Sequence, residues 1–143
     1  MHRQMLKSKV HRATVTARDP DYIGSITLDP ELMRAADLLA SEQVHVWDVG
    51  TGARFVTYAI EGESGSGAVE VNGAAALLVA EGDKVIVASF AAYDDAEVGA
   101  HAPRVVHVDE RNRVAGIDAE PGLLLGSPLA SGAPSAVLEE LGS

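Results

Sequence analysis

The chain contains no cysteine among its 143 residues. Disulfide bonds, thiolate nucleophiles and zinc–thiolate sites are therefore excluded. No apolar run approaches the ~20 residues that a membrane helix requires, and the first residues hold no apolar segment that could act as a signal peptide. We expect a cytoplasmic protein, because a chain without disulfides suits a reducing compartment.

Positive charge is scarce, since 11 Lys and Arg face 21 Asp and Glu and the net charge is -10. This balance disfavours nucleic acid or an anionic membrane as a partner, because both need a cationic face. The bases are unevenly distributed, however. Residues 1–18 hold five of the eleven and no acid. A local cationic segment in an acidic protein fits a small anionic ligand.

Short strands dominate the expected secondary structure. The length and the 47% hydrophobic content allow one compact domain. Alternating and β-branched stretches predict strands over residues 9–17, 25–28, 43–49, 53–61, 68–71, 84–90 and 104–108. Gly-rich turns separate them, and residues 109–112 are expected to close a hairpin. The pattern indicates a mostly-β fold, a small barrel with short helical inserts.

One helix has clear boundary signals. Asp29 is placed to cap it, with Pro30 in the first helical position. Its buried face is expected to comprise Leu32, Ala35, Ala36 and Leu39.

The composition changes near residue 114. We expect one domain over residues 1–114. Residues 115–143 hold three of the six prolines and many Gly, Ser and Ala. This stretch predicts a flexible C-terminal tail that contributes little to the core.

Five motifs occur in order along the chain: residues 5–9 with 11–16 (MLKSK, HRATVT), 22–25 (YIGS), 52–54 with 57–58 (GAR, TY), 72–76 (NGAAA) and 82–86 (GDKVI). In this order and spacing, they resemble the motifs of the pyruvoyl-dependent aspartate 1-decarboxylases. The resemblance covers nearly all of residues 1–113. Two positions depart from the family pattern: Ser64 stands where an Arg is usual, and Phe90 where a Tyr is common. The resemblance implies a six-stranded double-psi-type β-barrel.

The resemblance implies that the chain cleaves itself between Gly24 and Ser25. The Ser25 hydroxyl attacks the Gly24 carbonyl, and elimination and hydrolysis leave a pyruvoyl group at the new N-terminus of residues 25–143. Thr57 is the family's hydrogen-bonding group for the developing oxyanion. Gly-Ser occurs four times in this sequence, so the dipeptide alone indicates only a turn. The neighbouring motifs select the first copy.

The resemblance also implies roles in decarboxylation. The pyruvoyl ketone forms a Schiff base with the substrate amine and replaces pyridoxal phosphate. Arg54 and Lys9 are the expected carboxylate-binding residues, and Tyr58 is the expected proton donor. Without the resemblance, each would be read as an ordinary strand residue, with the two cations exposed.

Small residues follow the strand that ends near Asn72. Asn72, Gly73, Ala74 and Ala75 read locally as a turn before a helix, where free backbone N–H groups can bind an anion or orient an imine. His11 and Tyr22 are possible pocket residues, and His11 is equally consistent with a core or interface histidine. The five histidines show no metal spacing, so no metal is expected.

The resemblance thus implies decarboxylation of L-aspartate to β-alanine and CO2 for pantothenate synthesis, in a homotetramer with sites between subunits. The alternative from another class is an unprocessed, non-catalytic β-barrel that binds a partner or acts as a scaffold.

Overall fold

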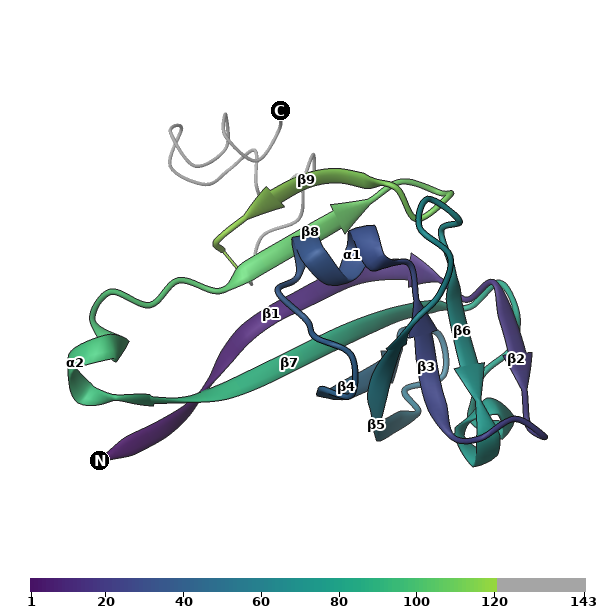
Figure 1. The fold of residues 1–143 in the computed structure, drawn as a ribbon, viewed down its shortest axis with the longest axis horizontal. Coiled ribbons are helices and arrows are strands. Elements are labelled where there is room, and N and C mark those ends of the chain that lie inside the picture. The colour runs from purple at the N-terminus through teal and green to yellow at the C-terminus, as the bar shows by residue number, and fades with distance from the viewer. Residues whose placement is uncertain (121–143) are drawn as a thin grey trace.

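The structure, a computed structural model, describes residues 1–120 of the chain (Figure 1). Its strands are β1 (His2–Thr14), β2 (Ala17–Asp19), β3 (Ser25–Leu28), β4 (Gln43–Asp48), β5 (Arg54–Glu61), β6 (Val69–Asn72), β7 (Lys84–Asp94), β8 (Arg104–Val108) and β9 (Val114–Asp118). Its helices are α1 (Pro30–Ala35), the 3-10 helix η1 (Gly73–Leu78) and α2 (Asp95–Val98). The mostly-β prediction is confirmed. None of these helices combines the length and hydrophobicity needed to span a bilayer.

The sheet closes on itself because β1 and β2 are one bent stretch of chain. The strand order is β2-β6-β3-β5-β4-β7-β1-β8-β9, and only Val15 and Thr16 separate β1 from β2. Thr16 N donates to Val69 O (2.9 Å), and Val15 N donates to Asp83 O (2.8 Å). With β1 and β2 counted as one strand, β6, β3, β5, β4 and β7 complete a six-stranded barrel, from which β8 and β9 extend.

Alternate side chains on each strand point into the barrel. One inward row crosses four strands and consists of Val10, Val87, Val46 and Phe55. Its three valines are at most 1% exposed. The next row points outward and consists of Lys9, Ala88, His45 and Val56. The register therefore assigns Lys9, and Arg54 two residues before Val56, to the outer face.

The start of α1 is as predicted, and its buried face is as predicted except at Leu39. Asp29 caps the helix by accepting from Glu31 N (2.9 Å). Leu32 and Ala36 are buried, whereas Leu39 is 73% exposed. The helix ends at Ala35, and the chain then turns through Asp37 at φ +54. Met33 and Leu38 are buried in its place, so the expected Leu39 contact is wrong.

Several strand boundaries differ from the predictions. β1 begins at His2 and β7 continues to Asp94, and the two form the long ribbon in Figure 1. The helix α2 at its tip was not predicted, although Asp94 and Glu97 form a capping box there. β9 pairs with β8, so the first residues of the expected tail form a strand. The rest of that expectation, residues 121–143, lies outside the described residues.

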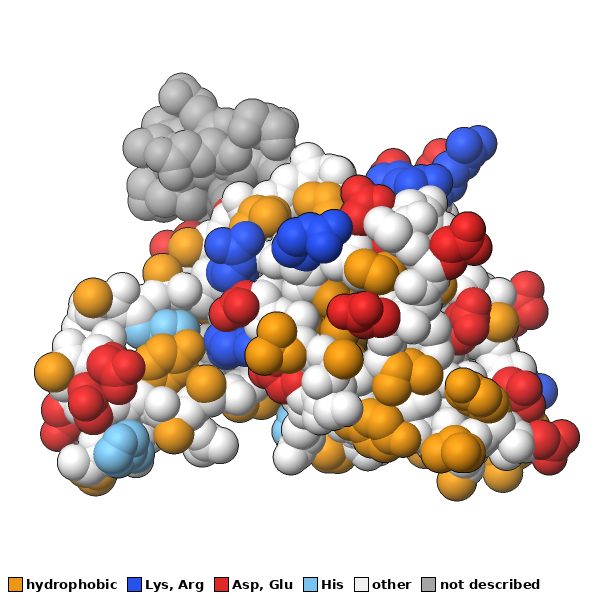
Figure 2. All heavy atoms as spheres, viewed as in Figure 1, with side chains coloured by type: hydrophobic (Ala, Val, Ile, Leu, Met, Phe, Trp, Pro, Cys, Tyr) orange, Lys and Arg blue, Asp and Glu red, His pale blue; other side chains and the backbone are white. Residues whose placement is uncertain are grey.

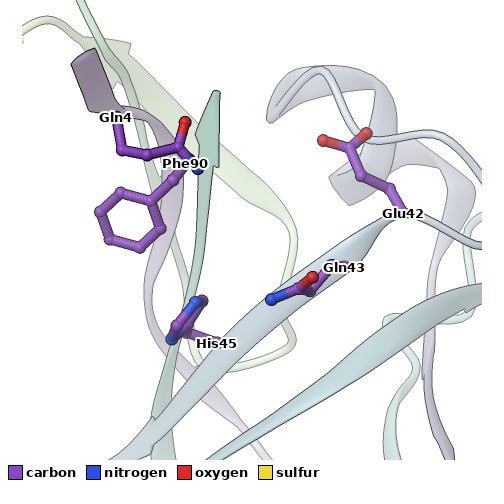
Figure 3. A pocket seen from close by; sticks show the side chains of 5 residues that line it. All are labelled: Gln4, Glu42, Gln43, His45 and Phe90. Carbon is purple, nitrogen blue, oxygen red and sulfur yellow. The ribbon is translucent and has the colours of Figure 1, made fainter. Parts of the chain in front are cut away.

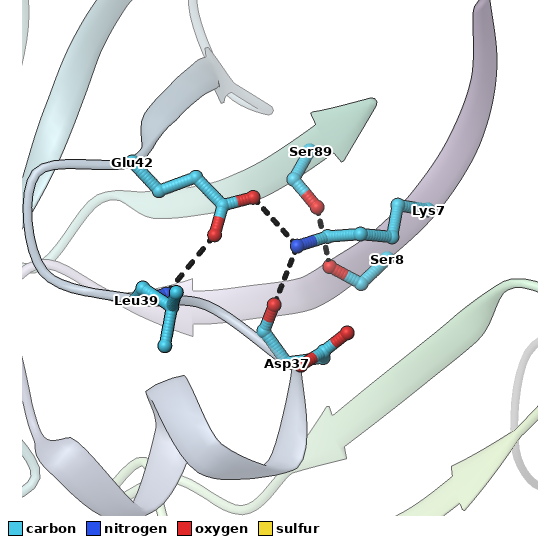
Figure 4. A network of polar contacts seen from close by, with 6 residues as sticks. All are labelled: Lys7, Ser8, Asp37, Leu39, Glu42 and Ser89. Atoms are coloured by element: carbon cyan, nitrogen blue, oxygen red, sulfur yellow. Dashed lines mark hydrogen bonds and ion pairs between the residues drawn. The ribbon is translucent and has the colours of Figure 1, made fainter. Parts of the chain in front are cut away.

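One base of the cationic N-terminal segment has a structural role. Lys7 donates to the Glu42 carboxylate and to the Asp37 carbonyl, as Figure 4 shows. Beside it, the buried hydroxyls of Ser8 and Ser89 share a hydrogen bond of 2.6 Å. The Lys7 contacts connect β1 to the segment between α1 and β4, and the Ser8–Ser89 bond connects β1 to β7. Lys7 therefore stabilises the fold.

We predict that Asp29→Ala lowers the free energy of unfolding by about 2–4 kcal/mol, because Asp29 accepts from the backbone N–H groups of Glu31, Gly65 and Gly67 while 2% exposed. Burial acts to raise the pKa of Asp29, but these N–H groups lower it below its ordinary value. The stabilisation is therefore present above the ordinary pKa and declines at lower pH. Urea unfolding at several pH values measures it.

The control for this prediction is Asp95→Ala, which removes an exposed carboxylate in the first turn of α2. Its effect should remain below about 0.5 kcal/mol. Equal effects of the two substitutions would contradict the assigned role of Asp29.

Candidate active site

Ser25 is buried where β3 and β6 meet. It begins β3 and pairs with Asn72, the last residue of β6. The Asn72 side-chain amide donates to Ser25 Oγ (3.1 Å) and to Thr27 Oγ1 (3.1 Å). Ser25 and Asn72 are 2% and 4% exposed, and Ser25 Oγ also lies 3.4 Å from the Ile23 carbonyl oxygen. The hydroxyl is thus held beside the Gly24–Ser25 peptide.

Gly73 lies directly against the same peptide. Its φ is +71, and a Cβ there would lie 2.6 Å from Gly24 Cα and 2.9 Å from Gly24 N. Only glycine fits both the conformation and the contact. At Gly24 itself, a Cβ would meet nothing within 4 Å, and its φ is not in the left-handed region. The steric need for glycine at this peptide therefore falls on Gly73 and not on Gly24.

The start of β5 lies alongside this peptide. β3 and β5 are parallel, and their first paired residues are Ile26 and Ala59. Extending that register backwards sets Ser25 beside Tyr58 and Gly24 beside Thr57. Arg54, Val56 and Tyr58 are exposed on one face of β5, as predicted, and Tyr58 is 38% exposed. Thr57 and Tyr58 thus lie on the strand next to β3 and directly precede its first paired residue, Ala59.

A surface hollow of about 490 Å³ is lined by Thr27 of β3 and Glu70 of β6, and not by Ser25 itself. Asn72 and Tyr22 line it, together with the acidic residues Asp19, Glu61 and Glu70 and the single base Arg18. Arg18 donates to the Ala76 carbonyl in η1 (3.1 Å). Neither Lys9 nor Arg54 lines this hollow. Among the described residues, the predicted carboxylate-binding cations therefore do not lie in this hollow.

Lys9 and Arg54 lie on strands separated by β7 and β4. Three steps of ~4.8 Å separate β1 from β5 in the sheet. The Arg54 guanidinium lies over the Trp47 ring, 5.0 Å from its centre, which is a cation–π contact. Burial lowers the pKa of Lys9, and the Asp118 carboxylate partly offsets this.

His11 belongs to a cluster built from three strands. Its ring lies edge-on to that of His107, with centres 5.8 Å apart. His107 Nε2 lies 2.6 Å from Asp118 Oδ2. Both ring nitrogens of His11 are buried without a hydrogen-bond partner within residues 1–120. Burial, followed by the charge of Lys9, lowers the pKa of His11 to about 4. His11 is therefore neutral at physiological pH.

His107 and Asp118 were not among the predicted site residues. They come near His11 only because β1 pairs in parallel with β8 and β8 with β9. No spacing in the sequence signals that arrangement.

Ala74 and Ala75 follow Gly73 in η1, whose first residues lie next to Gly24. Exposed apolar side chains surround this end of the barrel, and Figure 2 shows such side chains gathered on the part of the surface that carries η1. They include Tyr22, Ile23, Leu77 and Leu78, which are 52%, 77%, 72% and 46% exposed. An apolar surface of this kind is typical of a contact with another protein chain.

A second hollow lies on the outer face near β4 and holds none of the predicted site residues. It has a volume of about 370 Å³ and is lined by Gln4, Glu42, Gln43, His45 and Phe90 (Figure 3). The rings of His45 and Phe90 meet edge to face with centres 5.1 Å apart. Phe90, one of the two departures from the family pattern, therefore lines this hollow and not the one that Tyr22 and Asn72 line.

We predict that acid weakens the fold through His11. Its folded-state pKa of about 4 lies below its ordinary value of 6.5, so its contribution is complete above pH 6.5 and is lost as the pH falls towards 4. In His11→Gln, this loss should shrink by about 1–2 kcal/mol, a figure reduced for solvent screening. Chemical unfolding at pH 7, 5.5 and 4 measures it, with the exposed His2→Gln as control. An NMR titration of His11 near 6.5 would contradict it.

Comparison with known proteins agrees with the geometry at Ser25. The family model described as "Aspartate decarboxylase" matches residues 1–115. An aspartate 1-decarboxylase of Mycolicibacterium smegmatis (strain ATCC 700084 / mc(2)155) is 54% identical over 121 residues, which cover 85% of this chain and 89% of that protein. Nothing found supports the alternative of a non-catalytic scaffold. The chain belongs to the aspartate decarboxylase family.

Proposed function

We propose that this protein is a pyruvoyl-dependent aspartate 1-decarboxylase, which converts L-aspartate to β-alanine and CO2 for pantothenate synthesis in the cytoplasm. The observation that carries the proposal is the setting of Ser25. Its hydroxyl is held by Asn72, while Gly73 packs against the peptide that precedes it. Family membership over residues 1–115 supports the same reaction.

The first reaction is self-cleavage between Gly24 and Ser25. Ser25 Oγ attacks the Gly24 carbonyl carbon, the peptide nitrogen leaves, and the amide becomes an ester. Elimination releases Gly24 as a free carboxylate and leaves dehydroalanine at position 25. Water then releases ammonia and leaves the pyruvoyl group. A serine hydroxyl is a weak nucleophile, so orientation by Asn72 and oxyanion stabilisation by Thr57 are the chain's contributions.

The residues around Ser25 fit a pyruvoyl group at that position. Asn72 offers it an amide donor, and η1 begins beside it with the small residues Gly73, Ala74 and Ala75, which leave their backbone accessible. When formed, the group supplies a carbonyl that binds the substrate amine and accepts the electron pair released with CO2. We assign Tyr58, next to Ser25 in the extended register, as the donor of the proton that replaces the carboxylate.

Substrate binding requires cations, because aspartate carries two carboxylates. We assign this role to Arg54, whose guanidinium suits a bidentate contact, and to Lys9 as a point charge. His11 and Tyr22 complete the pocket. Since Lys9 and Arg54 do not line the hollow that Tyr22 and Asn72 line, we place the site between subunits of a homotetramer. The exposed outer face of β5 and the apolar surface around η1 support such contacts.

Substitution of Ser25 tests the proposal directly. The wild-type protein should separate into residues 1–24 and 25–143, the larger with a blocked N-terminus, and should release CO2 from L-aspartate. Ser25→Ala should stay whole and inactive, because it lacks the attacking oxygen. Intact-protein mass spectrometry and CO2 release measure both results.

Ser66→Ala is the matched control, because it alters another Gly-Ser dipeptide, in the turn where Ser66 Oγ donates to the Glu63 carbonyl. It should remain cleaved and active. An intact wild-type chain with full decarboxylase activity would overturn the proposal.

We also predict that Gly73→Ala slows self-cleavage by at least tenfold. The added methyl group would overlap Gly24 and move the scissile carbonyl relative to Ser25 Oγ, and small misplacements can cost about 100-fold in rate. Gly52→Ala is the control, since Gly52 has a similar φ of +78 but open space around it. Time-resolved mass spectrometry of freshly expressed protein measures the rates. Equal rates in the two variants would contradict the role of the Gly73 contact.

A further inference from the structure

A buried carboxylate lies in line with Lys9 across three strands. Lys9 of β1 pairs with Val105 of β8, and Val105 pairs with Asp118 of β9. Paired residues project from the same face of a sheet. His11 and His107 are the corresponding pair two residues further along β1 and β8. One face therefore presents Lys9, His11, His107 and Asp118 together.

The Asp118 carboxylate is fixed by two hydrogen bonds. Oδ2 accepts from His107 Nε2 at 2.6 Å, and Oδ1 accepts from Glu120 N at 2.9 Å. A carboxylate can only accept, so the Nε2 nitrogen of His107 carries the hydrogen. The side chains of His107 and Asp118 are 8% and 11% exposed. This carboxylate is therefore held in one place, as a positioned charge and not as a mobile surface group.

We propose that Asp118, held by His107, is a positioning residue that keeps Lys9 charged for the carboxylate of the substrate. The inference rests on the proposed function, because it takes Lys9 as a substrate-binding cation. Partial burial disfavours an ammonium group, and a fixed negative charge nearby compensates. The family model ends at residue 115, so Asp118 lies beyond the residues that define the family.

The other named groups near Lys9 are positive or neutral. Lys9 has His11 on its own strand, Ala88 opposite it on β7, and Val105 and His107 on β8. His11 is neutral above its pKa of about 4, and Arg12 adds a positive charge near His11. Within the described residues, Asp118 is the acidic group whose charge raises the pKa of Lys9. Its removal should therefore make Lys9 lose its proton at lower pH.

NMR can follow Lys9 without any assay of activity. The chain has only three lysines, Lys7, Lys9 and Lys84. Their amines can be labelled with [13C]methyl groups in the purified full-length protein, assigned with Lys9→Arg, and titrated from pH 7 to 12. In Asp118→Asn the Lys9 midpoint should move to lower pH, while Lys84 should not move. Asp118→Glu, which restores the charge, should bring the Lys9 midpoint back towards the wild-type value.

Enzyme kinetics give the second readout. We compare kcat/KM for L-aspartate in Asp118→Asn with that in the wild type and express the two as a ratio, variant over wild type. This ratio should fall at least fivefold between pH 7 and pH 10. The change should reside in KM, and kcat should remain nearly constant. Glu120→Gln removes a charge two residues away but keeps the backbone N–H donor, so its ratio should not depend on pH. A purely structural loss would lower the ratio equally at all pH values.

The outcomes separate the two claims. Coincident Lys9 titrations in wild type and Asp118→Asn would overturn the role of Asp118, whatever the activity. An uncleaved and inactive wild-type chain would instead overturn the proposed function, and the NMR titration would still decide on Asp118. If Asp118→Asn does not fold, Asp118→Ser retains a hydroxyl acceptor for His107 and makes the same prediction for Lys9.

Discussion

Closure of the sheet at Thr16 is the constraint on which the rest of the structure depends. Thr16 N donates to the Val69 carbonyl, and Val69 N donates to Thr16 Oγ1 (3.0 Å). These bonds join the segment between β1 and β2 to β6, so the two sides of one sheet become a barrel. A closed sheet has a distinct inside and outside, and the register of each strand then fixes which side chains point outward. Positions of the candidate site residues follow from that register.

The reactive peptide lies where several strands begin or end. β3 starts at Ser25, β6 ends at Asn72 and η1 starts at Gly73. Strand interiors offer few free backbone groups, whereas such junctions combine buried side chains with backbone that is open to new contacts. The hydrogen bond from Asn72 to Ser25 and the close contact of Gly73 with Gly24 both depend on this junction. A self-cleaving peptide needs that combination of restraint and access.

In the proposed mechanism, the arrangement of charges separates substrate binding from the chemistry at Ser25. Acidic residues dominate the hollow that Tyr22 and Asn72 line, while Lys9, Arg54 and His11 are not part of its lining. Contact between subunits would bring the cations of one chain to the Ser25 of another, which agrees with the apolar surface around η1. On the face that carries Lys9, the His107–Asp118 pair supplies a fixed negative charge. In the proposed mechanism, substrate binding and chemistry thus depend on different parts of the barrel.

The sequence by itself determined the mostly-β class, the Asp29 cap of α1 and the alternation on β5, because each depends on residues close in the chain. Its motifs also selected Gly24–Ser25 among four Gly-Ser dipeptides. Only the tertiary structure placed the steric requirement at Gly73, ended α1 before Leu39, and brought His107 and Asp118 to the face of Lys9. These features depend on strand pairings between residues far apart in the sequence, and local patterns contain no information about register.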